Sequence, residues 1–168
     1  MKKIIIVLFL FTLIFLINKE KEEYIIPDSA IRLRVIASSN TFEDQATKME
    51  IKNNIENILR TDLVSVLNKQ QADEAINQKI PEIKTMINNY NLPYNINYGM
   101  NYFPEKSYKG VKYEEGMYES LVVTLGSGKG DNWWCILFPP LCLMEAQESN
   151  IDDVDYTFFV KDIFKKYM

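Results

Sequence analysis

The order in which different periodicities follow one another limits the folds open to this chain. Apolar residues recur at helical spacing between residues 41 and 90, whereas residues 94–125 alternate as strands do. An earlier strand is expected at 31–37, which begins with alternating apolar and cationic residues. Helices gathered early and strands gathered late predict an α+β fold: one strand, two to three helices, then a mainly antiparallel sheet.

The two helical stretches carry different end signals. Thr41 is a good N-cap for the first, and Glu43 and Asp44 lie in its first turn, where the helix dipole favours acids. The second stretch contains Pro81. Because a proline inside a helix costs about 3 kcal/mol, the sequence predicts a break there, with Pro81 beginning a new segment.

The second half of the chain reads as strands and connections. Residues 94–102 and 117–125 predict a pair of strands, and 104–116, with two glycines and a proline, predict a long connection between them. Residues 126–132 predict a loop. Residues 154–160 are strand-like and are expected to run into a terminal helix.

The N-terminus has the pattern of an export signal. Lys2 and Lys3 precede fourteen residues, 4–17, of which only Thr12 is polar. As a helix this run spans about 21 Å, less than a hydrocarbon core of about 30 Å, and no small-residue cleavage site follows it. The sequence therefore predicts a signal sequence or membrane anchor at 1–23, a linker at 24–30 and a single exported domain at 31–168.

Composition excludes several function classes. The net charge is −4 with no concentrated basic stretch, which opposes nucleic-acid binding. The chain has no histidine, so triads with a histidine base and histidine-ligated zinc are ruled out. Carboxylates for a two-acid hydrolase exist, but sequence shows no pair at the required separation; the candidates are Glu114, Glu115, Glu119 and Asp131. No cofactor and no metal are expected.

Glycines and cysteines allow only weak chemical hypotheses. The loop Gly126–Gly130 lacks the spacing of a phosphate-binding loop, and a turn between strands fits it better. Cys135 and Cys142 form either a disulfide or two buried free thiols. A disulfide would close a loop of eight residues and stabilise the fold by roughly 2.5 kcal/mol.

Two surfaces are candidates for binding a partner. Aromatic residues beside exposed prolines are typical of binding hot spots, although the same block could belong to the core; this first set comprises Trp133, Trp134, Phe138, Pro139 and Pro140, with Gly128, Lys129 and Asn132 from the adjoining loop. A second surface is expected where the first strand ends. There Asp44 and Gln45 could form an ion-paired cluster with the strand arginines; this set comprises Arg32, Ser38, Asn40, Asp44 and Gln45.

Two blocks of the sequence resemble a known family. Residues 31–40, continued by Glu43-Asp44-Gln45 and Lys48, look like the N-terminal block of the stage II sporulation protein R family. Residues 128–142, with Trp133-Trp134-Cys135 and Phe138-Pro139-Pro140-Leu141-Cys142, resemble its C-terminal block. The resemblance spans most of 31–160. Arg34 stands where the family has a histidine, so no proton-transfer role is expected at that position.

The resemblance implies a signalling protein and not an enzyme. Members of this family are secreted across the forespore membrane into the space between the two sporulation membranes. They activate a membrane-embedded aspartic peptidase there, which then processes the sigma-E precursor. The residues alone leave open an exported carboxylate-based hydrolase, a thiol-dependent oxidoreductase using Cys135 and Cys142, or a passive protein of the spore envelope.

Overall fold

The computed structural model describes residues 24–108, 111–145 and 153–167. The predicted signal sequence or anchor, 1–23, lies outside the described residues. Within the described ranges, no helix combines the length and the apolar character that crossing a bilayer requires.

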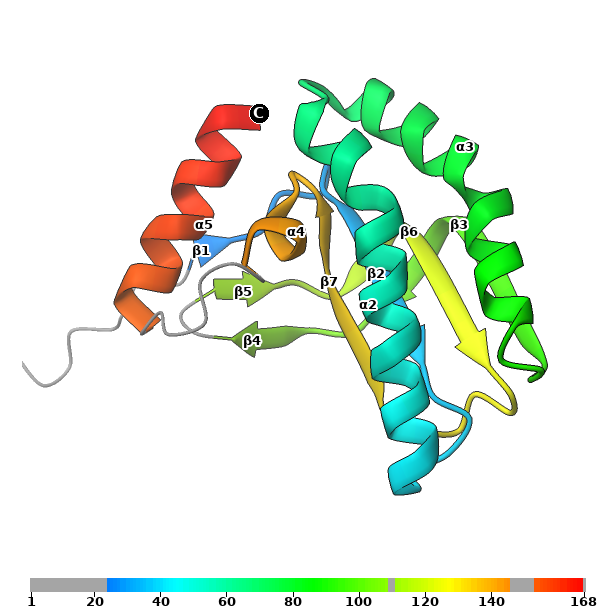
Figure 1. The fold of residues 1–168 in the computed structure, drawn as a ribbon. Coiled ribbons are helices and arrows are strands. Elements are labelled where there is room, and N and C mark those ends of the chain that lie inside the picture. The colour runs from blue at the N-terminus through cyan, green and yellow to red at the C-terminus, as the bar shows by residue number, and fades with distance from the viewer. Residues whose placement is uncertain (1–23, 109–110, 146–152, 168) are drawn as a thin grey trace, which may run out of the picture.

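Four strands form the main sheet in the order β3-β6-β2-β7 (Figure 1). They are β2 (Ile31–Ile36), β3 (Tyr94–Phe103), β6 (Gly116–Leu125) and β7 (Asn132–Phe138). Strand β2 is parallel to β6, and the β2–β7 and β3–β6 pairs are antiparallel. The α+β class and the predominance of antiparallel pairing are therefore confirmed, as is the predicted pairing of the strands near 94–102 and 117–125.

A small second sheet corrects two predictions. It contains β1 (Tyr24–Ile25), β5 (Val111–Tyr113) and β4 (Lys106–Tyr108), in the order β1-β5-β4. Residues 24–30 are thus not merely a linker, since Tyr24 pairs with Val111 and Ile26 is buried in the core. Residues 104–116, predicted as a long connection, contain β4 and β5, which pair with each other in antiparallel fashion. The linker prediction failed because the partner of β1 lies far along the chain, whereas the β4–β5 pair is local and was missed because each strand has only three residues.

Helices α2 (Phe42–Ser65) and α3 (Lys69–Asn88) cover one face of the main sheet. The predicted cap of α2 is confirmed, because the Asp44 amide donates to Thr41 Oγ1 at 3.3 Å. The predicted break at Pro81 is wrong, since α3 continues through it. Pro81 faces solvent, while Ile76 and Ile83 on either side are buried. Packing of the apolar stripe holds the helix together across the missing hydrogen bond.

Two shorter helices complete the described chain, α4 (Leu141–Glu145) and α5 (Asp153–Tyr167). The strand expected at 154–160 is wrong, because this segment is the beginning of α5. The helical spacing of its buried residues is visible only over the whole segment to the C-terminal end, and not within 154–160 alone. These buried residues are Tyr156, Val160, Ile163, Phe164 and Tyr167.

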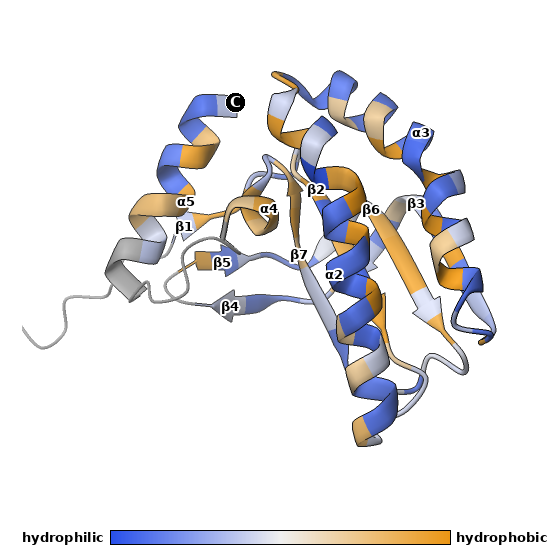
Figure 2. Cartoon of the chain, in the orientation of Figure 1, coloured by the Kyte–Doolittle hydropathy of each residue, from blue (hydrophilic) through white to orange (hydrophobic). Residues whose placement is uncertain are grey.

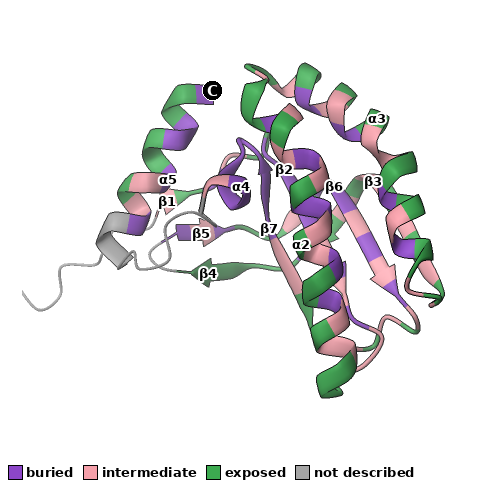
Figure 3. Cartoon of the chain, in the orientation of Figure 1, coloured by how far each residue is buried: buried purple, intermediate pink, exposed green. Residues whose placement is uncertain are grey.

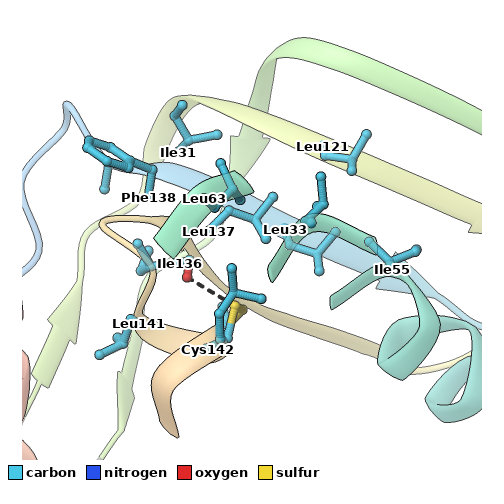
Figure 4. Packing of buried hydrophobic residues seen from close by; sticks show 14 of the residues in the cluster. Ile31, Leu33, Ile55, Leu63, Leu121, Ile136, Leu137, Phe138, Leu141 and Cys142 are labelled. Atoms are coloured by element: carbon cyan, nitrogen blue, oxygen red, sulfur yellow. Dashed lines mark hydrogen bonds between the residues drawn. A yellow bond between two sulfur atoms is a disulfide. The ribbon is translucent and has the colours of Figure 1, made fainter. Parts of the chain in front are cut away.

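The hydrophobic core lies between the main sheet and the helices. Leu33 on β2 and Leu121 on β6 face Ile55 and Leu63 of α2 (Figure 4). The outer faces of α2 and α3 are hydrophilic and exposed (Figures 2 and 3). Because side chains alternate along a strand, Arg32 and Arg34 lie on the opposite face of the sheet from α2.

Candidate functional site

Two loops meet at one end of the main sheet, where β2 leads into α2 and β6 turns into β7. We call residues 37–48 and 126–131 together the loop clasp. The Asp131 amide donates to Asn40 Oδ1 at 2.6 Å, and Asn40 Nδ2 donates back to Asp131 Oδ1 at 3.3 Å. The Lys129 amide donates to the Ser38 carbonyl at 3.1 Å. Segments about ninety residues apart are therefore joined by reciprocal hydrogen bonds.

Lys48 lies at the centre of the loop clasp. Only 5% of its surface is exposed, and its ammonium group donates to Gln45 Oε1 at 2.6 Å and to the Asp131 carbonyl at 3.2 Å. Gln45 Nε2 in turn donates to the Ser39 carbonyl at 3.0 Å and to Asn40 Oδ1 at 3.1 Å. The polar groups of these side chains are hydrogen-bonded to one another and to the backbone of both loops, so the arrangement holds the two loops in place.

The glycine-rich loop takes part through its backbone. A Cβ atom at Gly130 would lie 2.6 Å from the Ser39 carbonyl carbon and 2.9 Å from Ala37 Cβ. Contact this close requires glycine. Ser127 Oγ also donates to the Ser38 carbonyl at 2.7 Å. The segment connects β6 to β7, so the predicted turn between strands is confirmed.

The second predicted surface is brought together only in part. Ser38, Asn40, Asp44 and Gln45 meet in the loop clasp, where Asp44 accepts a 2.5 Å hydrogen bond from Ser39 Oγ. Arg32 does not join them. The predicted ion pairing of Asp44 with the strand arginines is wrong, because those arginines project from the other face of the sheet.

Arg32 is fully buried among aromatic rings. Its guanidinium carbon lies 3.3 Å from the centroid of Tyr118 and 5.2 Å from that of Phe103. Tyr113 and Trp134 are each 5.8 Å away. Burial lowers the pKa of Arg32, and within the described ranges its nitrogens have no hydrogen-bond partner. Arg32 therefore acts as a packing residue and not as an exposed contact.

A pocket of about 420 Å³ lies along the outer edge of β7. We call it the edge pocket. Residues 132–135 of β7 form one wall. The other walls come from α2, β4, β5, α4 and α5; their lining residues are Lys52, Glu56, Lys106, Tyr108, Tyr113, Cys142 and Tyr156.

Rings and ammonium groups dominate the edge pocket. Lys52 Nζ lies 4.3 Å from the ring centroid of Trp133 and forms a 2.9 Å ion pair with Glu56. Lys106 Nζ lies 5.1 Å from the ring of Trp134. The Trp134 ring also packs 5.6 Å from Tyr113. Such a wall suits binding through aromatic packing and charge pairing.

The two cysteines form a disulfide that joins β7 to α4. Both line the edge pocket. Their sulfur atoms and a carboxylate oxygen of Glu56 lie within 4.8 Å of one another. The sulfurs are bonded to each other, so they offer no thiolate for a metal in this state.

The burial of Phe138, Pro139 and Pro140 corrects the first predicted surface. Phe138 is 1% exposed, and both prolines are buried. The second half of β7 turns into the core and α4 folds back over it (Figure 4). The expectation of exposed prolines is therefore wrong. Trp133 and Trp134 remain half-buried in the edge pocket, and Gly128 and Lys129 lie in the loop clasp.

Sequence reasoning missed most walls of the edge pocket. Lys52 lies on an ordinary polar helix face, and Lys106 and Tyr108 belong to a segment read as a connection. Tyr156 lies in a segment that the sequence predicts as a strand. No local pattern indicates that these residues meet, because they come from separate elements.

The fold and its site define a small α+β domain with an aromatic and cationic pocket beside an open sheet edge. Residues 27–148 match the family model described as stage II sporulation protein R. The chain belongs to this family, as its two sequence blocks indicated. It is 35% identical over 134 residues to stage II sporulation protein R of Bacillus subtilis (strain 168), and this match covers 76% of the chain. The match spans 60% of that relative's length. No solved structure matches the chain.

Proposed function

We propose that this protein is an exported sporulation signal that binds and activates a membrane-embedded aspartic peptidase, which then processes the sigma-E precursor. The chain would cross the forespore membrane into the intermembrane space, with residues 1–23 directing export or holding it at the membrane. Family membership gives the sporulation context. The edge pocket carries the proposal of a binding role, because its walls offer two tryptophans and two lysines to a partner.

The placement of the candidate acids favours binding over carboxylate-based hydrolysis. Glu119 pairs with Lys69 at 2.7 Å, Glu115 accepts from the Tyr102 hydroxyl at 3.3 Å, and Asp131 belongs to the loop clasp. Glu114, the fourth candidate, is exposed next to Glu115 before β6. Glu115, Glu119 and Asp131 each have a different partner, which favours structural roles over the facing pair of carboxyl groups that glycoside hydrolysis uses. Glu56 in the edge pocket is held by Lys52.

Activation requires that the protein bind the active state of the peptidase more tightly than the inactive state. Half-buried tryptophans suit this role, since hot spots are enriched in tryptophan and lie in well-packed pockets. We therefore expect Trp133 and Trp134 to contribute most of the binding free energy.

Reconstitution tests the proposed function. The full-length chain, the purified peptidase and the sigma-E precursor are combined in lipid vesicles, and precursor cleavage is followed over time. Cleavage should depend on the chain and should fall when Trp133→Ala or Trp134→Ala replaces it. Phe158→Ala is the matched control, because Phe158 is an aromatic residue 62% exposed on α5 and outside the pocket. Equal cleavage with and without the chain would refute the proposal.

A further inference from the structure

We propose that the edge pocket receives an extended, acidic segment of the peptidase, which adds a strand to the outer edge of β7 and pairs a carboxylate with Lys106. This inference rests on the proposed function. It names the surface, the binding mode and the chemistry of the segment that is bound.

The lining of the pocket places it on a strand edge. Four consecutive residues, 132–135, line it. Successive side chains of a strand point to opposite faces, so a pocket touching all four runs along the edge and not over one face. In the main sheet, β7 is the terminal strand, and no described strand pairs with its outer side.

Only the first half of β7 is open. Residues 132–134 are exposed or half-buried, whereas 135–138 are buried, and α4 packs over the end of the strand. An unpaired edge presents backbone donors and acceptors in a row. A peptide of three or four residues in extended form would pair with these groups, as in β-strand addition.

The walls are suited to the side chains of such a peptide. Alternate residues of an added strand point to opposite sides. Side chains on one side of the peptide would contact Trp133 and Lys52 of α2. Side chains on its other side would contact Trp134 together with Tyr108 and Lys106 of the small sheet. The aromatic rings offer apolar contact, and the lysines offer charge.

The charge of the walls favours an acidic occupant. Lys52 is already paired with Glu56, whereas Lys106 is exposed and forms no ion pair with any described residue. A carboxylate beside Trp134 would complement it. A second copy of this chain fits less well, because two edge pockets facing each other would bring like-charged lysines together.

The experiment measures binding of the full-length chain to the purified peptidase in detergent micelles. Lys106→Glu should weaken binding on the order of tenfold or more, because it places like charges together. Lys84→Glu makes the same charge change at an exposed site on α3 and should leave the affinity unchanged. Added salt should weaken binding of the wild-type chain and have less effect on Lys106→Glu.

Hydrogen exchange locates the contact independently of any substitution. Binding should slow amide exchange at residues 132–135. Protection confined to α3 or to the loop clasp, or equal affinities for Lys106→Glu and Lys84→Glu, would overturn this inference and leave the proposed function intact. Protection of β7 that grows with the concentration of the chain alone would make a second copy the occupant and would overturn it too. Failure of the wild-type chain to bind or activate the peptidase would overturn both.

Discussion

Replacing Lys48 by methionine tests whether the loop clasp is a structural device. Lys48→Met keeps the apolar stem and removes the ammonium group, which donates to Gln45 Oε1 and to the Asp131 carbonyl. Each hydrogen bond from a charged donor contributes about 1.5–3 kcal/mol. Removing a charge that is only 5% exposed also recovers part of its desolvation cost. The net loss should be about 2 kcal/mol, and a domain of this size should lose about 4–8 °C in Tm.

Thermal unfolding followed by circular dichroism measures this loss, with urea unfolding as an independent check. Lys84→Met is the matched control, because Lys84 is exposed on α3, and surface changes are usually within about 0.5 kcal/mol. If Lys48→Met unfolds at the temperature of the control, the hydrogen bonds of Lys48 do not hold the two loops together.

Three further substitutions test the roles of the disulfide, of Arg32 and of Tyr98. Replacing Cys135 and Cys142 by alanine should lower the unfolding free energy by roughly 2.5 kcal/mol in urea titrations. Because both cysteines line the edge pocket, activation of the peptidase should weaken but persist at excess chain; complete loss at excess chain in a folded variant would favour thiol chemistry. Arg32→Met should leave stability unchanged or raise it, since the cost of burying the guanidinium outweighs its favourable interactions with Tyr118 and Asp28 and lowers its pKa; a loss above about 2 kcal/mol would contradict this. Burial and the 2.6 Å hydrogen bond to Asp73 raise the pKa of Tyr98 above its usual value of 10.0. The unfolded state therefore loses this proton first, and stability should fall as the pH rises past 10. Tyr98→Phe should flatten that fall in urea midpoints.

Local sequence patterns were sufficient to predict those helices, strands and turns that are specified by their own residues. The cap at Thr41, the alternation around β3 and the glycines of the turn before β7 each fixed an element that the structure confirms. The α+β class followed from the order of these periods. The meeting of the two sequence blocks in the loop clasp did not follow, because hydrogen bonds such as those between Asn40 and Asp131 span 91 residues.

Predictions failed where tertiary packing overrides a local preference. Pro81 remains inside α3 because the apolar stripe on both sides is buried. The prolines after β7 read as exposed anchors, yet they lie in the turn between β7 and α4, where both are buried. The edge pocket exists because β7 is the terminal strand of the main sheet and its outer edge is bordered by β4 and α2. The residues of β7 themselves do not indicate this arrangement.

Strand addition at the edge pocket is strong enough, by order of magnitude, to act as a switch. Moving a peptidase from about 1% to about 99% active requires roughly 5.5 kcal/mol of differential binding. Two or three backbone hydrogen bonds contribute about 0.5–1.5 kcal/mol each, and one tryptophan hot spot contributes about 2 kcal/mol or more. Together these approach the requirement, provided that the acidic segment is presented only in the active state. Trp134→Ala would then lower the affinity about thirtyfold and remove most of the activation at limiting concentrations of the chain, whereas excess chain would restore it.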